Sequence, residues 1–173
     1  RTSLNTASLS INPGMFFIND VVVRNNNGNS EIYAAVGTSL SRDVADTALG
    51  SGTNDGIYKS TDAVNWTKID LYRPVETDAN GNTTSPNRTA IPIDLEIDDS
   101  NNIWASTTRD IYGEGGGLIF RSNESVTSFT LIHQIEEARR TEIEFSADNK
   151  LFVLAQKYKT INNNQYWLPI IYR

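Results

Sequence analysis

Two pairs of acidic residues stand at alternate positions within otherwise apolar stretches of the chain. Asp94 and Glu96 form one pair, and Glu142 and Glu144 form the other. Alternate residues of a β-strand project from the same face, so each pair would present two carboxyl groups together. Glycoside hydrolysis requires two carboxyl groups roughly 5–9.5 Å apart across the scissile bond. The pairs therefore suggest a cation or sugar site or, more simply, a solvated strand face.

Aromatic residues in predicted loops offer a second kind of chemistry. An aromatic ring presents a flat apolar face on which a sugar ring can stack, while its polar atoms remain in water. The candidates lie in the second and third long loops and are Tyr112, Tyr158, Tyr166 and Trp167. Packing within the loops explains the same residues equally well.

The residue types give little support to metal or cofactor chemistry. The chain has no cysteine, and His133 is its one histidine. Segment 78–82 has oxygen ligands at alternate positions but lacks the later glycine and glutamate of a helix-flanked calcium loop. The glycine-rich stretch 113–117 precedes no helical pattern, unlike a phosphate-binding loop. The sequence therefore predicts no metal site and no cofactor.

Composition narrows the class of protein. The chain has 173 residues, 38% of them hydrophobic and 21% charged, which is typical of a folded domain with a core rather than a disordered chain. The formal net charge of −6 argues against a nucleic-acid partner, because such partners require a basic surface. No apolar run approaches the roughly 18 residues of a membrane helix. We therefore expect neither a nucleic-acid partner nor a membrane span.

The elements that would position these residues are β-strands, and their pattern repeats. Helical periodicity is nearly absent, whereas short alternating or β-branched runs follow one another between Asn- and Gly-rich turns. The pattern restarts twice. It predicts a first four-stranded unit, a linker loop, a second four-stranded unit and an incomplete third, over residues 16–71, 72–90, 91–135 and 141–173. A four-stranded antiparallel unit repeated in sequence is typical of a β-propeller blade.

A hairpin motif marks the outer turn of the first two predicted units. The first copy is Ser60-x-Asp62-x-x-x-Trp66, and its serine precedes the serine of the second copy by 62 residues. The second copy is longer by one residue, and its three marked positions are Ser122, Glu124 and Phe129. Short Ser and Asp side chains bond backbone groups inside tight turns, and a following aromatic residue packs over them. We therefore interpret all six residues as structural.

These hairpins resemble the Asp-box, or bacterial neuraminidase repeat, which typically reads Ser-x-Asp-x-Gly-x-Thr-Trp. The first copy lacks the glycine and the threonine, and the second has Glu for Asp and Phe for Trp. The resemblance covers most of residues 16–172 and implies a sialidase-like or sortilin-like β-propeller. It places the boxes on the blade periphery and the first strand of each blade at the central channel. Asp94, Glu96, Glu142 and Glu144 would then line that channel.

Two functions are compatible with this resemblance. The first is a non-catalytic exported or cell-surface propeller that binds a glycan or a protein, or that serves as a scaffold. The second is a glycoside hydrolase of the sialidase or xyloglucanase type, with most catalytic residues outside these 173. The nearest string to the sialidase arginine motif is Tyr72-Arg73-Pro74, which lacks the intervening residue and follows the box. The first function is therefore preferred.

The number of blades raises the question of what completes the ring. Propellers typically close with about 4–8 blades, and this chain supplies fewer than three complete ones. The first residue is Arg1 rather than methionine, so we expect a piece of a longer exported protein whose remaining blades are its main partner. Assembly with copies of itself is the alternative. The composition also resembles that of large exported proteins of bacteria.

Overall fold

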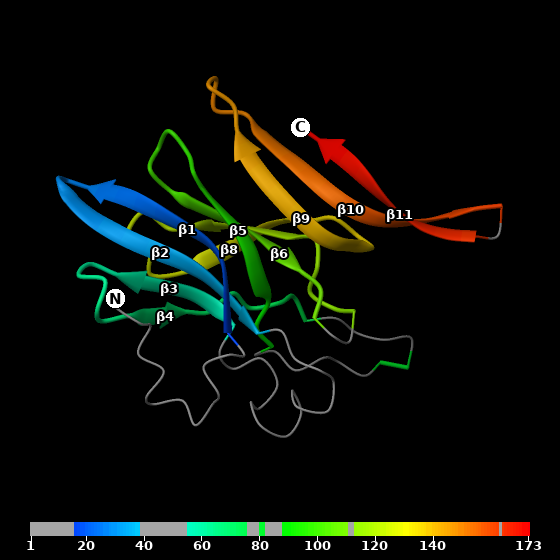
Figure 1. Ribbon diagram of the computed structural model, residues 1–173, viewed down its shortest axis with the longest axis horizontal. Coiled ribbons are helices and arrows are strands. Elements are labelled where there is room, and N and C mark those ends of the chain that lie inside the picture. The colour runs from blue at the N-terminus through cyan, green and yellow to red at the C-terminus, as the bar shows by residue number, and fades with distance from the viewer. Residues whose placement is uncertain (1–15, 39–54, 76–79, 82–87, 111–112, 163) are drawn as a thin grey trace.

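The computed structural model describes residues 16–38, 55–75, 80–81, 88–110, 113–162 and 164–173 (Figure 1). The described residues form strands and turns and no helix, which confirms the predicted all-β, antiparallel class. The strands are β1 (Phe16–Asn26), β2 (Asn29–Thr38), β3 (Gly56–Ser60), β4 (Thr67–Ile69), β5 (Ile91–Ile97), β6 (Ile103–Thr108), β7 (Leu118–Ser122), β8 (Phe129–Gln134), β9 (Ala138–Phe145), β10 (Leu151–Ile161) and β11 (Asn164–Tyr172).

The first four strands form a four-stranded sheet in the order β1-β2-β3-β4. Each strand pairs antiparallel with the next along the chain. β1 and β2 are joined by Asn27 and Gly28, which both have positive φ angles of 53° and 87°. Such angles suit the tightest hairpin turns, and Asn and Gly adopt them most readily. We call this sheet the first unit.

The remaining strands form one seven-stranded sheet, although the sequence pattern predicted separate units. Strands β5–β8, the second unit, pair in chain order, and so do β9–β11, the third unit. A single residue pair, Thr108 with Arg140, connects β6 to β9 and joins the two units. Glycine permits this approach, because a Cβ on Gly116 would clash with the carbonyls of Ala138 and Arg139 at the start of β9. The two units therefore share a single ladder pair, and hydrogen bonds from the hydroxyls of Ser106 and Thr141 to backbone carbonyls of the other unit reinforce it.

Two apolar cores lie between the units. The first core joins side chains of the first unit, such as Tyr33 and Ile57, to side chains of the second, such as Leu95 and Phe120. The second core joins Ile119 of the second unit to residues of β9 and β10. Figure 1 shows the first unit and the β9–β11 strands on opposite sides of β5. The second unit therefore buries one face against each of its neighbours in the chain.

The turn between β3 and β4 has the hydrogen bonds expected of the Ser-x-Asp motif. The Ser60 hydroxyl accepts the amide of Ala63 at 2.9 Å, and a carboxylate oxygen of Asp62 accepts the amides of Val64 and Asn65 at 2.8 and 2.7 Å. These amide donors lower the pKa of Asp62, since they favour its charged form. Trp66 is half-buried at the end of the turn. The first motif is thus a self-contained polar turn.

The turn between β7 and β8 uses a different residue from the one that the motif alignment assigned. The side-chain oxygen of Asn123, not that of Glu124, accepts the amides of Thr127 and Ser128 at 2.8 and 3.2 Å. The extra residue in this turn lets the side chain directly after Ser122 reach these amides. The Ser122 hydroxyl accepts the amide of Ile103 at 2.9 Å, which ties the turn to β6.

Arg24 of β1 ties the first unit to two turns of the second, those after β5 and β7. Its side chain is buried, and its Nε donates to the carbonyl of Asn101 at 2.8 Å. Its Nη2 donates to the carbonyl of Glu124 at 2.7 Å, and its Nη1 forms an ion pair with Glu31 at 3.1 Å. One guanidinium group therefore satisfies two backbone carbonyls of the neighbouring unit and one carboxylate of its own.

Glu31 is buried but remains charged because several donors surround it. Burial disfavours its charge, but hydrogen bonds from Lys59, Tyr33 and Asn26 outweigh burial and lower the pKa of Glu31 to about 2. The Lys59 ammonium lies 2.7 Å from the carboxylate, and the Tyr33 hydroxyl donates to it at 2.7 Å. Removal of Arg24 would leave this carboxylate partly compensated and two carbonyls without their donor.

We expect Arg24→Ala to lower the free energy of unfolding by about 2–4 kcal/mol. This is somewhat less than the cost of breaking a buried ion pair completely, because Lys59 still neutralises Glu31 in the variant. Urea denaturation followed by tryptophan fluorescence measures the change. Arg140→Ala is the matched control, since it removes an exposed arginine from an ion pair with Glu142, and we expect it to cost less than about 1 kcal/mol. Equal losses for the two variants would refute the role assigned to Arg24.

Candidate functional site

Register places one acidic residue at the same position of each first strand. Asp20 of β1 pairs with Ala35, Asp94 of β5 with Ser106, and Glu142 of β9 with Leu154. In every case the acid lies three residues before the first-strand member of one reference pair, which is Val23–Ile32, Ile97–Ile103 or Phe145–Leu151. The β1–β2 ladder continues beyond its reference pair to Asn26–Asn29. In β1 and β5 a β-bulge directly precedes the acid. The three acids are therefore structurally equivalent.

Two of these acids join their own unit to the next one. A carboxylate oxygen of Asp20 accepts the backbone amide of Leu95 in β5 at 2.9 Å. A carboxylate oxygen of Asp94 accepts the backbone amide of Ile143 in β9 at 2.7 Å. A bulge re-aims a side chain away from the regular strand face, which here directs the acid at the neighbouring first strand. Adjacent first strands are therefore connected by a carboxylate rather than by a β-ladder.

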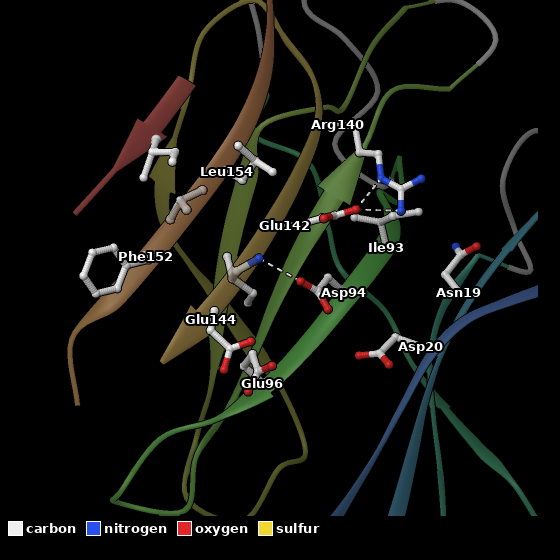
Figure 2. Close-up of a pocket in the computed structure, with 13 residues that line it drawn as sticks. Asn19, Asp20, Ile93, Asp94, Glu96, Arg140, Glu142, Glu144, Phe152 and Leu154 are labelled. Atoms are coloured by element: carbon white, nitrogen blue, oxygen red, sulfur yellow. Dashed lines mark hydrogen bonds and ion pairs between the residues drawn. The ribbon is translucent and has the colours of Figure 1, made fainter. Parts of the chain in front are cut away.

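The same acids line a groove across the three first strands. Its volume is about 610 Å³, and Figure 2 shows Asp94 between the acids of β9 and those of β1. Glu96 and Glu144 lie next to each other at one end. The other lining residues are Asn19, Asp20, Ile93, Arg140, Glu142, Ile143, Phe152, Val153, Leu154 and Ile171. The groove thus has an acidic floor and, along β10 and β11, an apolar wall.

Asp94 and Glu96, the two groove acids of β5, hold their protons unusually well. Burial raises the pKa of Asp94 to about 6 with help from the charges of Asp20 and Glu142, although the amide of Ile143 opposes the shift. Burial raises the pKa of Glu96 to about 7, and repulsion from Glu144 and Asp94 adds to the effect. Near pH 6–7 these two carboxyl groups can therefore donate as well as accept hydrogen bonds.

Glu142 of β9 has a counter-ion among the residues that line the groove, namely Arg140. The Nη2 of Arg140 lies 2.8 Å from its carboxylate, and the Nε of Arg140 donates to the same oxygen at 3.0 Å (Figure 2). Both side chains are about half-exposed, so the pair is solvated and readily rearranged. The β9 edge of the groove therefore offers both a cation and an anion to a polar ligand.

The arrangement suits recognition of a polar, uncharged ligand better than capture of a metal ion. Within the described ranges, no group of three or more acidic or histidine side chains is arranged to hold a metal. The groove instead combines several oxygen acceptors, two carboxyl groups with pKa values of about 6 and 7, and apolar side chains such as Phe152 and Leu154. Hydroxyl-rich ligands with an apolar face match such a surface.

The structure brings all four predicted channel acids into this one groove, namely Asp94, Glu96, Glu142 and Glu144. Sequence reasoning missed Asp20, which the groove also contains. The sequence did contain a hint of this position, because Asn19-Asp20-Val21 corresponds to Ile93-Asp94-Leu95 of the second unit. A single acidic residue, however, gives no alternating pattern of acidic and apolar residues.

The prediction of a third loop with aromatic residues was wrong, because Tyr158 lies in β10 and Tyr166 and Trp167 lie in β11, and none of the three lines the groove. Tyr158 and Trp167 pair across β10 and β11 with ring centroids 4.7 Å apart. The guanidinium groups of Arg109 and Arg139 each lie 5.6 Å from the Trp167 ring. The Trp167 ring is thus already in contact with an aromatic ring and two guanidinium groups, which compete with stacking of a glycan. Tyr166 is exposed but does not line the groove, and Tyr112 lies outside the described residues.

Comparison with protein-family models, with curated proteins and with solved structures found no match. In the part of the chain that the structure describes, no helix is long and apolar enough to cross a membrane. The site must therefore be interpreted from its own chemistry.

The raised pKa values predict that the protein is more stable at pH 5 than at pH 8. Asp94 and Glu96 bind protons more tightly in the folded than in the unfolded state, so folding is favoured below their folded pKa values of about 6 and 7. This contribution is present at pH 5 and is lost as the pH rises through 6–7. Both side chains are partly solvated, so we expect a difference of about 1–2 kcal/mol by urea denaturation.

Glu96→Gln is the diagnostic variant for this pH dependence. It cannot ionise, so it should be more stable than the wild type at pH 8 and should reduce the slope between pH 6 and 8. Glu136→Gln, an exposed residue between β8 and β9 that does not line the groove, serves as the control and should leave the slope unchanged. A wild-type stability that rises from pH 5 to 8 would contradict the assignment.

Proposed function

We propose that the chain forms consecutive blades of an Asp-box β-propeller. Three features support this fold. The strands of each unit pair in chain order, the first strands β1, β5 and β9 occupy equivalent positions, and neighbouring units share apolar cores. The Ser60–Asp62 turn has the internal bonds that an Asp-box requires. In a propeller the first strands face the central channel, so the acidic groove would lie there.

We further propose that the protein is a non-catalytic, exported or cell-surface binding module whose groove takes a glycan. The observation that carries this proposal is the convergence of equivalent acids from three first strands on one open groove beside apolar side chains. Sugar hydroxyls can donate to Asp20 and Glu144 and accept from the protonated forms of Asp94 and Glu96. The resemblance to Asp-box proteins favours a location outside the cell.

Neutral glycans fit the charges of the groove better than acidic ones. The groove has five acidic side chains and the single cation Arg140, which Glu142 already neutralises. A sialic acid carboxylate would meet these charges without the arginine cluster that usually binds it, and like charges placed together are strongly unfavourable. A xyloglucan-type oligosaccharide has hydroxyl groups and apolar ring faces but no carboxylate. It is therefore the preferred ligand class.

Isothermal titration calorimetry at pH 6 with a xyloglucan oligosaccharide, and separately with sialyllactose, tests this function. We expect binding of the neutral oligosaccharide with a Kd of roughly 10–1,000 μM, and weaker or no binding of sialyllactose. Glu144→Ala should weaken binding of the neutral oligosaccharide about tenfold, because it removes a solvent-exposed acceptor of the groove.

Glu136→Ala is the matched control and should bind like the wild type, because Glu136 is equally exposed but does not line the groove. Absence of binding by the wild type to both oligosaccharides would refute a glycan site. So would binding that Glu144→Ala leaves unchanged.

A glycoside hydrolase is the second candidate, and the raised pKa of Glu96 favours it. A general acid that works near neutrality requires a carboxyl group with a pKa close to 7, and burial raises the pKa of Glu96 to about 7. The neighbouring Glu144 would be the second carboxyl group that glycoside hydrolysis requires. Release of reducing sugar from xyloglucan by the wild type, abolished in Glu96→Gln, would establish hydrolysis and overturn the non-catalytic function. We expect no release above background.

A further inference from the structure

The outer face of the third unit exposes positions that are buried in the other two units. Leu154 and Ile171 lie beside Glu142 on this face and are 41% and 72% exposed. The equivalent neighbours of Asp94 are Ser106 and Ile119, and those of Asp20 are Ala35 and Ile57. All four of these residues are buried, at 2% exposure or less. The third unit therefore presents the kind of face that a following unit covers in the other two cases.

The opposite face of the first unit shows the reverse pattern. Val21 and Val23 of β1 are 49% and 59% exposed. In the strand register, Val21 corresponds to Leu95 of β5 and Val23 corresponds to Ile97. Leu95 is 1% exposed because it packs in the first core, and Ile97 packs against the same core. Phe17 and Ile18 are also exposed on β1. This face therefore resembles the side of β5 that packs against a preceding unit.

The polar groups of the two faces are complementary as well. The amides of Leu95 and Ile143 donate to the carboxylate of the preceding first strand, and Val21 holds the same register position in β1. Glu142 holds the position of the accepting acids Asp20 and Asp94. One end of the chain thus offers an amide and an apolar strand face. The other offers a carboxylate and an apolar strand face.

We propose that two copies of this chain associate head to tail, with the β9–β11 face of each copy against the β1 face of the other. The proposal rests on the assignment of the units as propeller blades. The two faces differ, so the contact is heterologous, and such contacts close into a ring when the rotation between subunits permits. Two copies of three units make six, which lies within the roughly 4–8 blades of closed propellers. In the dimer, Glu142 accepts the amide of the partner's Val21.

Sedimentation velocity and light scattering on the 173-residue protein at about 1–100 μM test the association. We expect a mass twice the 19.2 kDa of the chain. Val21→Lys and Leu154→Lys each place a charge on one of the two faces, and each should raise the dissociation constant at least about 100-fold. Both residues are exposed in the single chain, so neither change should unfold it. Ile132→Lys, at an exposed apolar residue of β8, is the matched control and should remain dimeric.

Mixing the two variants separates a head-to-tail contact from a symmetric one. A heterodimer of Val21→Lys with Leu154→Lys contains one contact made of two wild-type faces and one made of two altered faces. The mixture should therefore recover dimer that neither variant forms alone. A wild-type protein that is monomeric up to about 100 μM overturns the proposal. The proposal is also overturned if either variant alone still forms the dimer, or if the mixture of the two variants forms no dimer. Glu142, Leu154 and Ile171 of the β9–β11 face also line the groove, so the dimer covers part of its apolar wall. Glycan binding is therefore also measured on monomeric Val21→Lys, whose groove residues are unchanged, so failure of the dimer and failure of the proposed function are distinguishable.

Discussion

The fold depends on how each first strand satisfies its free edge. β5 pairs with β6, and β9 pairs with β10. The Leu95 amide of β5 and the Ile143 amide of β9 point to the opposite edge of their strands, toward the preceding unit. A carboxylate from the preceding unit accepts each of these amides. Unpaired buried amides are costly and exposed strand edges invite wrong pairings, so this one contact addresses both problems. The bonds from Arg24 to two turns of the second unit are a further polar contact between the first two units.

The same constraint gives the groove its chemistry. Acids that must reach a neighbouring strand are brought close together and partly removed from water, which raises the pKa values of Asp94 and Glu96. Asp94 therefore has two roles, because it holds β9 in place and forms part of the groove floor. A ligand that changes the protonation of Asp94 would act on the contact between units as well.

Much of this arrangement could be predicted from local patterns, and the remainder depends on register. Alternation located Asp94, Glu96, Glu142 and Glu144 in strands, and the Ser60–Asp62 turn followed from its residue types. Asp20 was missed, because only the bulge before it shows that it is equivalent to Asp94. Asn123, rather than Glu124, accepts the amides of the second turn because this turn is one residue longer than the first. The β6–β9 pair depends on a close approach at Gly116 that no periodicity reveals.

Amide hydrogen exchange at Ile143, measured by NMR in the wild type and in Asp94→Ala, tests the carboxylate contact most directly. We predict that the Ile143 amide is protected in the wild type and exchanges at least about tenfold faster in the variant, since Asp94 is its acceptor. The Leu95 amide, which donates to Asp20, should keep its protection in the same sample. Equal exchange of Ile143 in the two proteins would contradict the account.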